Sequence, residues 1–158
     1  QQKYKLAIKM FKEAVRSYPK FQTGYFNLGM VYEILGRHPE ATAQYRKILE
    51  LDPNHKKALL NLGWSLMDDN RFIEAIPPLK RIVSLNPEDT DAQYSLGLAY
   101  SKLNHYQKAR DQFQLVLQLN PNHSGAHEKL ALTQRKLKKD SVSANNTFPQ
   151  ELDIILIP

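Results

Sequence analysis

The sequence has no cysteine, a single tryptophan and no long apolar run. Without cysteine, the chain can form neither a disulfide nor a thiolate metal site. The absence of any run of about 18 apolar residues excludes an ordinary membrane-spanning helix. The first residues form an amphipathic pattern rather than a signal peptide, so a cytoplasmic location is the default expectation.

Excess charge is absent from the middle of the chain. Residues 22–123 contain eleven basic and eleven acidic side chains, whereas residues 1–21 carry a net charge of +5 and residues 124–140 of +3. Basic ends of this kind can attract nucleic acid or an anionic membrane. Exposed aromatic side chains are not interleaved with the basic ones, however. We therefore interpret both ends as solvated helix faces and expect no nucleic-acid partner and no membrane insertion.

Sequence motifs of catalytic, phosphate-binding and metal-binding sites are also absent. The sequence contains neither a glycine-rich phosphate loop nor a Ser–His–Asp order. His123 and His127 lie one helical turn apart, but no third ligand completes a metal-site spacing. We expect no catalytic residue, no metal site and no cofactor.

What the sequence does contain is a repeat with a fixed period. Residues 27–32, 61–66 and 95–100 read NLGMVY, NLGWSL and SLGLAY, and a decayed copy, KLALTQ, occupies residues 129–134. A constant spacing of this size indicates stacked repeats. Three further columns keep the period: Ala7, Ala41, Ala75 and Ala109; Phe11, Tyr45, Leu79 and Phe113; Pro19, Pro53, Pro87 and Pro121.

These columns resemble the tetratricopeptide repeat, whose pattern is W-x2-L-G-x2-Y, then A-x3-F, then P. The resemblance extends from about residue 3 to residue 138. It departs from the pattern in the leading aromatic column, which reads Tyr25, Leu59, Gln93 and His127. The resemblance implies an all-α, right-handed superhelical solenoid of antiparallel helix pairs. It also implies a non-enzymatic module that binds a protein or peptide partner.

The period divides the chain into six segments. Residues 1–21 match the second helix of a repeat whose first helix is missing, and residues 22–55, 56–89 and 90–123 are whole repeats. Residues 124–140 read as a capping helix, followed by an extended tail, 141–158, with an apolar end. The apolar face of the helix at residues 3–17 lacks a partner in the sequence. Either the array is longer, or this end contacts another molecule.

Several local features give sharper predictions. Gly36, Asn70 and Asn104 follow the first helices, where a left-handed residue commonly ends a helix. The glycine of each Leu-Gly pair lies inside a helix at a cost of about 1 kcal/mol, which predicts close helix contacts. Pro78 predicts a late start or a kink in the helix that begins near Ile73.

The unburied face of each first helix carries large apolar side chains. In the tetratricopeptide family these faces line a concave groove, and an exposed apolar patch usually marks a binding site. We expect the groove to hold an extended apolar peptide; the alternative is that these side chains pack on one another. The predicted peptide-binding residues are Phe26, Asn27, Met30, Leu60, Asn61, Trp64, Met67, Tyr94, Leu98 and Lys102.

Two known peptide-binding devices of the family can be compared with this face. Asn27 and Asn61 resemble the asparagine ladder that holds a peptide backbone, since an amide both donates and accepts. The chaperone-tail receptors use a clamp of basic and Asn side chains for two carboxylates. At the corresponding positions only Asn61 fits, and Asp91 repels a carboxylate, so we expect no such clamp. The positions compared are Phe26, Met30, Asn61, Asp91 and Ser95.

Two other roles stay open. The repeats could stack end to end into oligomers through the open N-terminal helix, or the chain could be the substrate-recognition arm of a larger enzyme. The segment from Leu152 to Pro158 is apolar, rich in β-branched residues and ends in proline, which favours an extended chain. We expect it to dock in the groove of its own chain or of a neighbour, and the second case would give a homo-oligomer. The alternative is a disordered tail or one that adheres to the capping helix.

Overall fold

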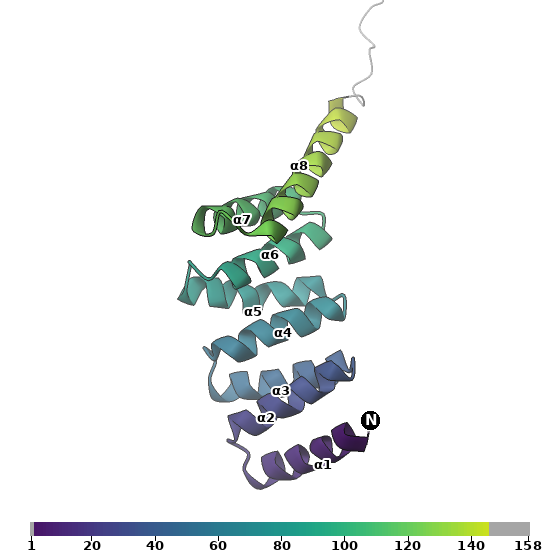
Figure 1. The fold of residues 1–158 in the computed structure, drawn as a ribbon, viewed down its shortest axis with the longest axis vertical. Helices are drawn as coiled ribbons and strands as arrows, with labels where there is room; N and C mark the ends of the chain where they lie inside the picture. Colours follow the sequence, from purple (N-terminus) through teal and green to yellow (C-terminus); the bar gives the residue numbers. More distant parts are fainter. Residues whose placement is uncertain (1, 146–158) are drawn as a thin grey trace, which may run out of the picture.

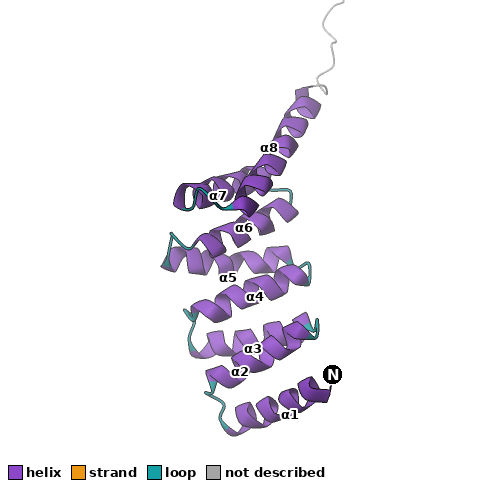
Figure 2. Ribbon diagram, viewed as in Figure 1, coloured by secondary structure: helices purple, strands orange, loops and turns teal. Residues whose placement is uncertain are grey.

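The structure, a computed structural model, describes residues 2–145, and every regular element within them is an α-helix (Figure 2). None of these described helices combines the length and the apolar character needed to cross a membrane. The all-α prediction is confirmed. The helices are α1 (Gln2–Ser17), α2 (Gln22–Ile34), α3 (His38–Leu51), α4 (Lys56–Asp68), α5 (Phe72–Leu85), α6 (Thr90–Lys102), α7 (Tyr106–Leu119) and α8 (Ser124–Asn145).

Each helix packs on the next, so antiparallel helix pairs stack in order along the chain from α1 to α8 (Figure 1). We call α2, α4, α6 and α8 the first helices and α3, α5 and α7 the second helices. The first helices begin at residues 22, 56, 90 and 124, and the second helices at 38, 72 and 106. This constant offset, equal to the sequence period, confirms the solenoid that the repeat predicts. Besides its pair partner, α6 also contacts α4 and α8.

The glycines of the Leu-Gly pairs lie where a first helix meets its second helix. A Cβ atom on Gly63 would lie 2.7 Å from Leu79 Cδ2, and one on Gly97 would lie 2.6 Å from Phe113 Cε1. Carbon atoms normally approach to about 3.5–4.0 Å. Leu79 and Phe113 are fully buried. The predicted close contact is confirmed, and it explains why the helices accept a residue with poor helix propensity.

The turns inside the pairs are alike. Gly36, Asn70 and Asn104 have φ angles of 67°, 59° and 58°, the left-handed region. In the second pair, the Asn70 amide donates to the Met67 carbonyl at 3.0 Å, and the following amide reaches back to Leu66 at 2.7 Å. These two bonds define the Schellman motif. The predicted helix ends are confirmed.

The first helices α4, α6 and α8 begin with side-chain caps. Asp89 Oδ1 accepts a hydrogen bond from the Ala92 amide at 3.0 Å, and Nδ1 of His55 and of His123 accept the equivalent bond at 3.2 and 3.1 Å. Asp89 also pairs with Lys56 Nζ at 2.6 Å. Burial raises the pKa of Asp89, but the bonds from Lys56 and Ala92 outweigh it and leave the pKa below its usual value. These caps satisfy amide groups that a helix start otherwise leaves unpaired.

Two expectations about where helices begin and end are wrong, while the kink at Pro78, the alternative to a late start, stays a prediction. The helix containing Pro78 does not start late, because α5 begins at Phe72, the position equivalent to the starts of α3 and α7. Pro78 is buried within the core-facing side of α5, so packing compensates for the lost backbone donor. The expected capping helix runs past residue 140 to Asn145, because no glycine or proline interrupts it there. The apolar segment from Leu152 to Pro158 lies outside the described residues.

The two sides of α1 differ. Val15 and Phe11 are half-buried and lie towards α2 and the core, whereas Leu6 and Met10 are exposed. No residue of α1 is fully buried. Within residues 2–145, nothing covers the outer apolar side of this helix.

Candidate functional site

The candidate site is the surface of the first helices opposite their buried side, which we call the first-helix face. In α2 the buried side contains Leu28 and Tyr32, and the equivalent residues of α4 and α6 are also buried. The structure places all ten predicted peptide-binding residues on helices α2, α4 and α6. Lys102, Met30 and Trp64 are exposed, and the half-buried ones are Phe26, Asn27, Leu60, Asn61, Met67, Tyr94 and Leu98.

One apolar column runs through all four first helices, with one member in each repeat period. It consists of Met30, Trp64, Leu98 and Leu132. Met30, Trp64 and Leu132 expose 39%, 43% and 45% of their surface, although each belongs to a helix packed into the array. Leu132 was not among the predicted residues. Its position one full period after Leu98 was the signal that could have identified it.

Several predicted residues also contribute to packing. The Phe26 ring lies 5.9 Å from that of Tyr45, and the Tyr94 ring lies 5.7 Å from that of Phe113 and 4.7 Å from that of His123. Leu60, Met67 and Leu98 pack against the core as well. These side chains therefore present only one edge to the first-helix face. Burial raises the pKa of the Tyr45 hydroxyl, with a smaller effect from the charge of Glu33.

Trp64 is held in place from the neighbouring helix pair. Its indole Nε1 donates a hydrogen bond to Ser95 Oγ in α6 at 2.9 Å. Ser95 is buried, and its hydroxyl donates to the Asp91 carbonyl at 2.7 Å. The chain of two bonds fixes the orientation of the ring while leaving much of it exposed. A fixed aromatic surface loses little side-chain entropy when it binds a ligand.

The polar residues among the predicted ones differ in how far contacts within the chain already occupy their polar groups. Asn61 Nδ2 donates to the Lys57 carbonyl of its own helix at 2.8 Å, while Asn61 Oδ1 accepts no hydrogen bond from the described residues. The Lys102 ammonium lies 6.0 Å from the centre of the Phe72 ring. Asn27 is half-buried. Asn61, one of the two asparagines predicted to form a ladder, therefore keeps its acceptor but not its full donor capacity for a peptide.

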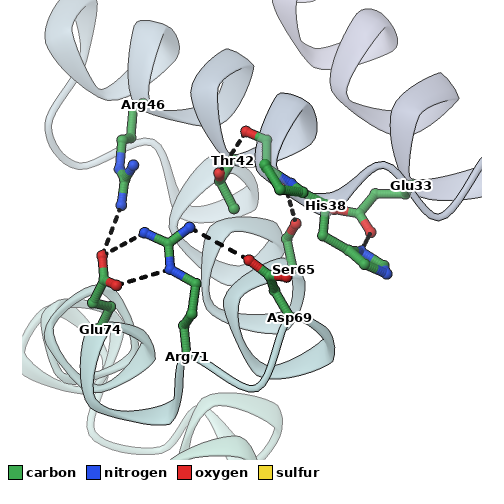
Figure 3. Close-up of polar contacts among 9 residues, drawn as sticks. Glu33, His38, Thr42, Arg46, Ser65, Asp69, Arg71 and Glu74 are labelled. Atoms are coloured by element: carbon green, nitrogen blue, oxygen red, sulfur yellow. Dashed lines mark hydrogen bonds and ion pairs between the residues drawn. The ribbon is translucent and has the colours of Figure 1, made fainter.

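A polar network lies around the junction of the first two helix pairs (Figure 3). Arg71 forms two bonds with Glu74, at 2.8 and 2.7 Å, and an ion pair with Asp69 at 3.5 Å. Arg46 reaches Glu74 from α3 at 3.3 Å. The hydrogen bonds from Arg71 lower the pKa of the Glu74 carboxyl despite some desolvation. The network ties α3 to α5 at the surface.

Comparisons with known proteins agree with this architecture. The tetratricopeptide repeat model matches residues 23–55 and 90–123. Residues 56–89 lie outside the matched segments, yet they form the same helix pair. The Hsp70-Hsp90 organizing protein of Triticum aestivum is 44% identical over 57 residues. The matched segment is 36% of this chain but only 10% of that protein.

Solved structures with a similar fold include two structures of MamA. The fragment from residue 41 of the Desulfovibrio magneticus RS-1 protein has a TM-score of 0.80 and 26% identity, over 90% of this chain and 80% of that one. Another MamA crystal structure has a TM-score of 0.81 and 22% identity, over 99% and 90%.

A further similar structure carries a ligand. It is the first repeat domain of Spaghetti (RPAP3) bound to the HSP90 peptide SRMEEVD, with a TM-score of 0.71 and 25% identity over 74% of this chain and 93% of that one. The repeat columns, the recurring helix bounds and these matches lead to one conclusion: the chain has the tetratricopeptide repeat fold, a protein-interaction fold, and residues 23–55 and 90–123 match the repeat model of that family.

Proposed function

We propose that the first-helix face lines a concave groove that holds an extended apolar segment of a partner protein, and that the chain acts by binding rather than catalysis. The observation that carries the proposal is Trp64, a large aromatic ring kept exposed and oriented by the Ser95 hydroxyl. Buried anchors at interfaces are enriched in tryptophan. A ring that served only the packing of the array would not need to face outward.

The residues around Trp64 support an apolar ligand. Met30 and Leu132 lie in the same column and are similarly exposed. Exposed apolar patches in a monomer commonly mark interaction sites. Methionine adapts its shape to different partners because it has three rotatable bonds and a polarizable sulfur. Burying each such side chain contributes roughly 1.5–3 kcal/mol.

The likeness to the RPAP3 domain raises the alternative of an acidic chaperone peptide. Phe26 and Met30 stand at two of the positions where the clamp of the family needs basic or amide groups, and Asp91 is exposed at a third. A carboxylate there opposes an acidic ligand by like-charge repulsion. We therefore place the apolar segment ahead of a peptide such as SRMEEVD.

The fluorescence of Trp64 tests the proposal directly, because it is the only tryptophan in the chain. A synthetic extended apolar peptide and the peptide SRMEEVD are titrated separately, with the emission of Trp64 and the heat of binding as readouts. We expect the apolar peptide to shift the emission and to bind more tightly. Trp64→Ala should weaken that binding by about 2 kcal/mol, roughly 30-fold.

The matched control is Ile73→Ala, which removes an exposed apolar side chain from α5, away from the first-helix face. It should leave the affinity unchanged. Tighter binding of SRMEEVD, or equal affinity of Trp64→Ala and the parent for the apolar peptide, would refute the proposed ligand.

A second candidate function is self-assembly through α1. Leu6 and Met10 expose apolar surface where a solenoid would normally continue into another helix. Sedimentation velocity over a range of protein concentrations measures this association. Larger species that disappear in a Leu6→Lys, Met10→Lys double variant would support assembly, whereas a constant monomer mass would eliminate it.

A further inference from the structure

Three potential metal ligands from three helices meet at the junction of the first two helix pairs. They are Glu33 in α2, His38 at the start of α3 and Asp68 at the end of α4, and one ligand atom from each lies within 4.8 Å of the others. Glu33 Oε2 and His38 Nδ1 are already 3.0 Å apart (Figure 3). No other group of this kind is found in residues 2–145.

The fold itself sets this arrangement. The turn at Gly36 reverses the chain between Glu33 and His38, so the two side chains face each other across it. Ser65 Oγ donates to the His38 carbonyl at 3.3 Å and thereby attaches the start of α3 to α4. Asp68 follows Ser65 by one helical turn, which brings its carboxylate to the same junction.

At the next junction, two of the equivalent positions also approach each other, with different side chains. The equivalents one repeat period later are Met67, Phe72 and Lys102. There the Lys102 ammonium lies over the Phe72 ring at 6.0 Å. That set supplies its own cation and no hard ligand, so it cannot hold a metal ion. Of these two junctions, only the first provides an imidazole and two carboxylates.

The first junction also has unused ligand capacity. Glu33 Oε1 is buried and accepts no hydrogen bond from a described residue. The Asp68 carboxylate forms no hydrogen bond or ion pair with the described residues and is exposed. The side chains of Glu33 and His38 are only 20% and 24% exposed. A buried carboxylate oxygen without a partner costs free energy that a bound cation would recover.

We propose that Glu33, His38 and Asp68 bind one divalent transition-metal ion, with Zn²⁺ as the best match. Zn²⁺ accepts imidazole nitrogen and carboxylate oxygen in a tetrahedral shell, and three protein ligands leave the fourth position for water or an exogenous group. Imidazole is a poor ligand for Mg²⁺ and Ca²⁺, which prefer oxygen. Sites without thiolates also suit a chain that has no cysteine.

The bound ion links three helices from two pairs. In a solenoid each pair contacts only its neighbours, so a cross-link at one junction stabilises that junction specifically. Because binding occurs in the folded state, Zn²⁺ raises the stability of the first two pairs according to its concentration and dissociation constant. The site would thus be a metal-dependent cross-link that stabilises the N-terminal half of the array.

Zn²⁺ alone, titrated into the intact chain, tests the site. Calorimetry gives the stoichiometry and affinity, and Co²⁺ substitution gives a visible absorption spectrum that reports a tetrahedral shell. We expect one ion per chain. His38→Ala and Asp68→Asn should each weaken binding at least about tenfold, since even outer-shell changes have effects of that size.

Two neighbouring variants serve as controls. Asp69→Asn removes a carboxylate one residue away that pairs with Arg71, and His105→Ala removes an exposed imidazole elsewhere. Both should bind Zn²⁺ like the parent. Should His38→Ala fail to fold, Asp68→Asn decides alone, because Asp68 is exposed. The proposal is overturned if the parent does not bind Zn²⁺, or if Asp68→Asn binds it as tightly as the parent.

Discussion

Gly63 and Trp64 are consecutive residues of α4, yet they lie on surfaces with opposite requirements. Gly63 contacts Leu79, and its counterpart Gly97 contacts Phe113 in the same way. The counterparts of Trp64 in the other first helices are methionine and leucine, so that column changes in shape from helix to helix. Stacking demands the same close contact at each pair, whereas the first-helix face is free to vary. We therefore predict that ligand specificity resides in the variable column.

The largest expected effect comes from filling the packing surface. Gly63→Leu would place a side chain in the space occupied by Leu79, and overpacking costs about 1–3 kcal/mol, occasionally more. We expect the upper end of this range in urea unfolding followed by circular dichroism. Ala43→Leu introduces the same side chain, with one carbon fewer added, at an exposed position of α3 and should cost less than about 0.5 kcal/mol. An unchanged urea midpoint for Gly63→Leu would show that the helices do not meet closely there.

A residue on neither surface gives an intermediate effect. Asp89→Ala removes the cap of α6 and the ion pair with Lys56, and loss of such a cap typically costs about 1 kcal/mol, within a range of about 0.5–2. The same unfolding assay measures it. Glu88→Ala, an exposed neighbour outside the cap, should stay within about 0.5 kcal/mol of the parent. Equal losses in the two variants would argue against a capping role.

Trp64→Ala should have a smaller effect on stability, at most about 1 kcal/mol, the usual contribution of one hydrogen bond. The Ser95 hydroxyl keeps its bond to the Asp91 carbonyl in this variant. Far-ultraviolet circular dichroism should show undiminished helix content. Unfolding of Trp64→Ala would assign Trp64 to the packing surface and remove the distinction between the two faces.

The smallest expected effect is a change in the stability contribution of Asp89 at low pH. The pKa of Asp89 is lower in the folded chain than in the unfolded chain, where it is about 3.9. The ionised carboxylate therefore stabilises the fold at a pH above the unfolded-state pKa, and this stabilisation is lost as the pH falls through the folded-state pKa. The stability of the parent should therefore exceed that of Asp89→Asn at about pH 6, and the gap should narrow below about pH 4. Urea midpoints measured from about pH 6 to about pH 2 would reveal it. A stability difference between the parent and Asp89→Asn that does not change with pH would show that ionisation of Asp89 does not stabilise the fold.

The repeat predicted the fold closely because each column has a local physical cause. The left-handed positions of Gly36 and Asn70 and the close contact at Gly63 follow from the spacing alone. The uninterrupted start of α5 did not follow, because burial of Pro78 is a tertiary effect that overrides helix propensity. Local rules therefore fixed the turns and packing columns, while tertiary contacts decided the exceptions.

The candidate site was harder to predict. Leu132 was missed because the decayed fourth copy read as a cap, and the caps of His55 and His123 were missed because imidazole is not a usual capping group. Packing divides the predicted face into exposed and half-buried members, which the repeat period cannot do. The meeting of Glu33 with Asp68, which are distant in the sequence, depends on how two helix pairs are set against each other.

The hydrogen bond between Trp64 and Ser95 joins two helix pairs across the first-helix face. If the helix stack bends so that its first-helix face opens, α4 and α6 move apart at that face. At 2.9 Å the bond tolerates only a few tenths of an ångström before it weakens. We therefore expect the emission of Trp64 to change whenever a ligand or a mechanical load alters the curvature of the array enough to weaken this bond.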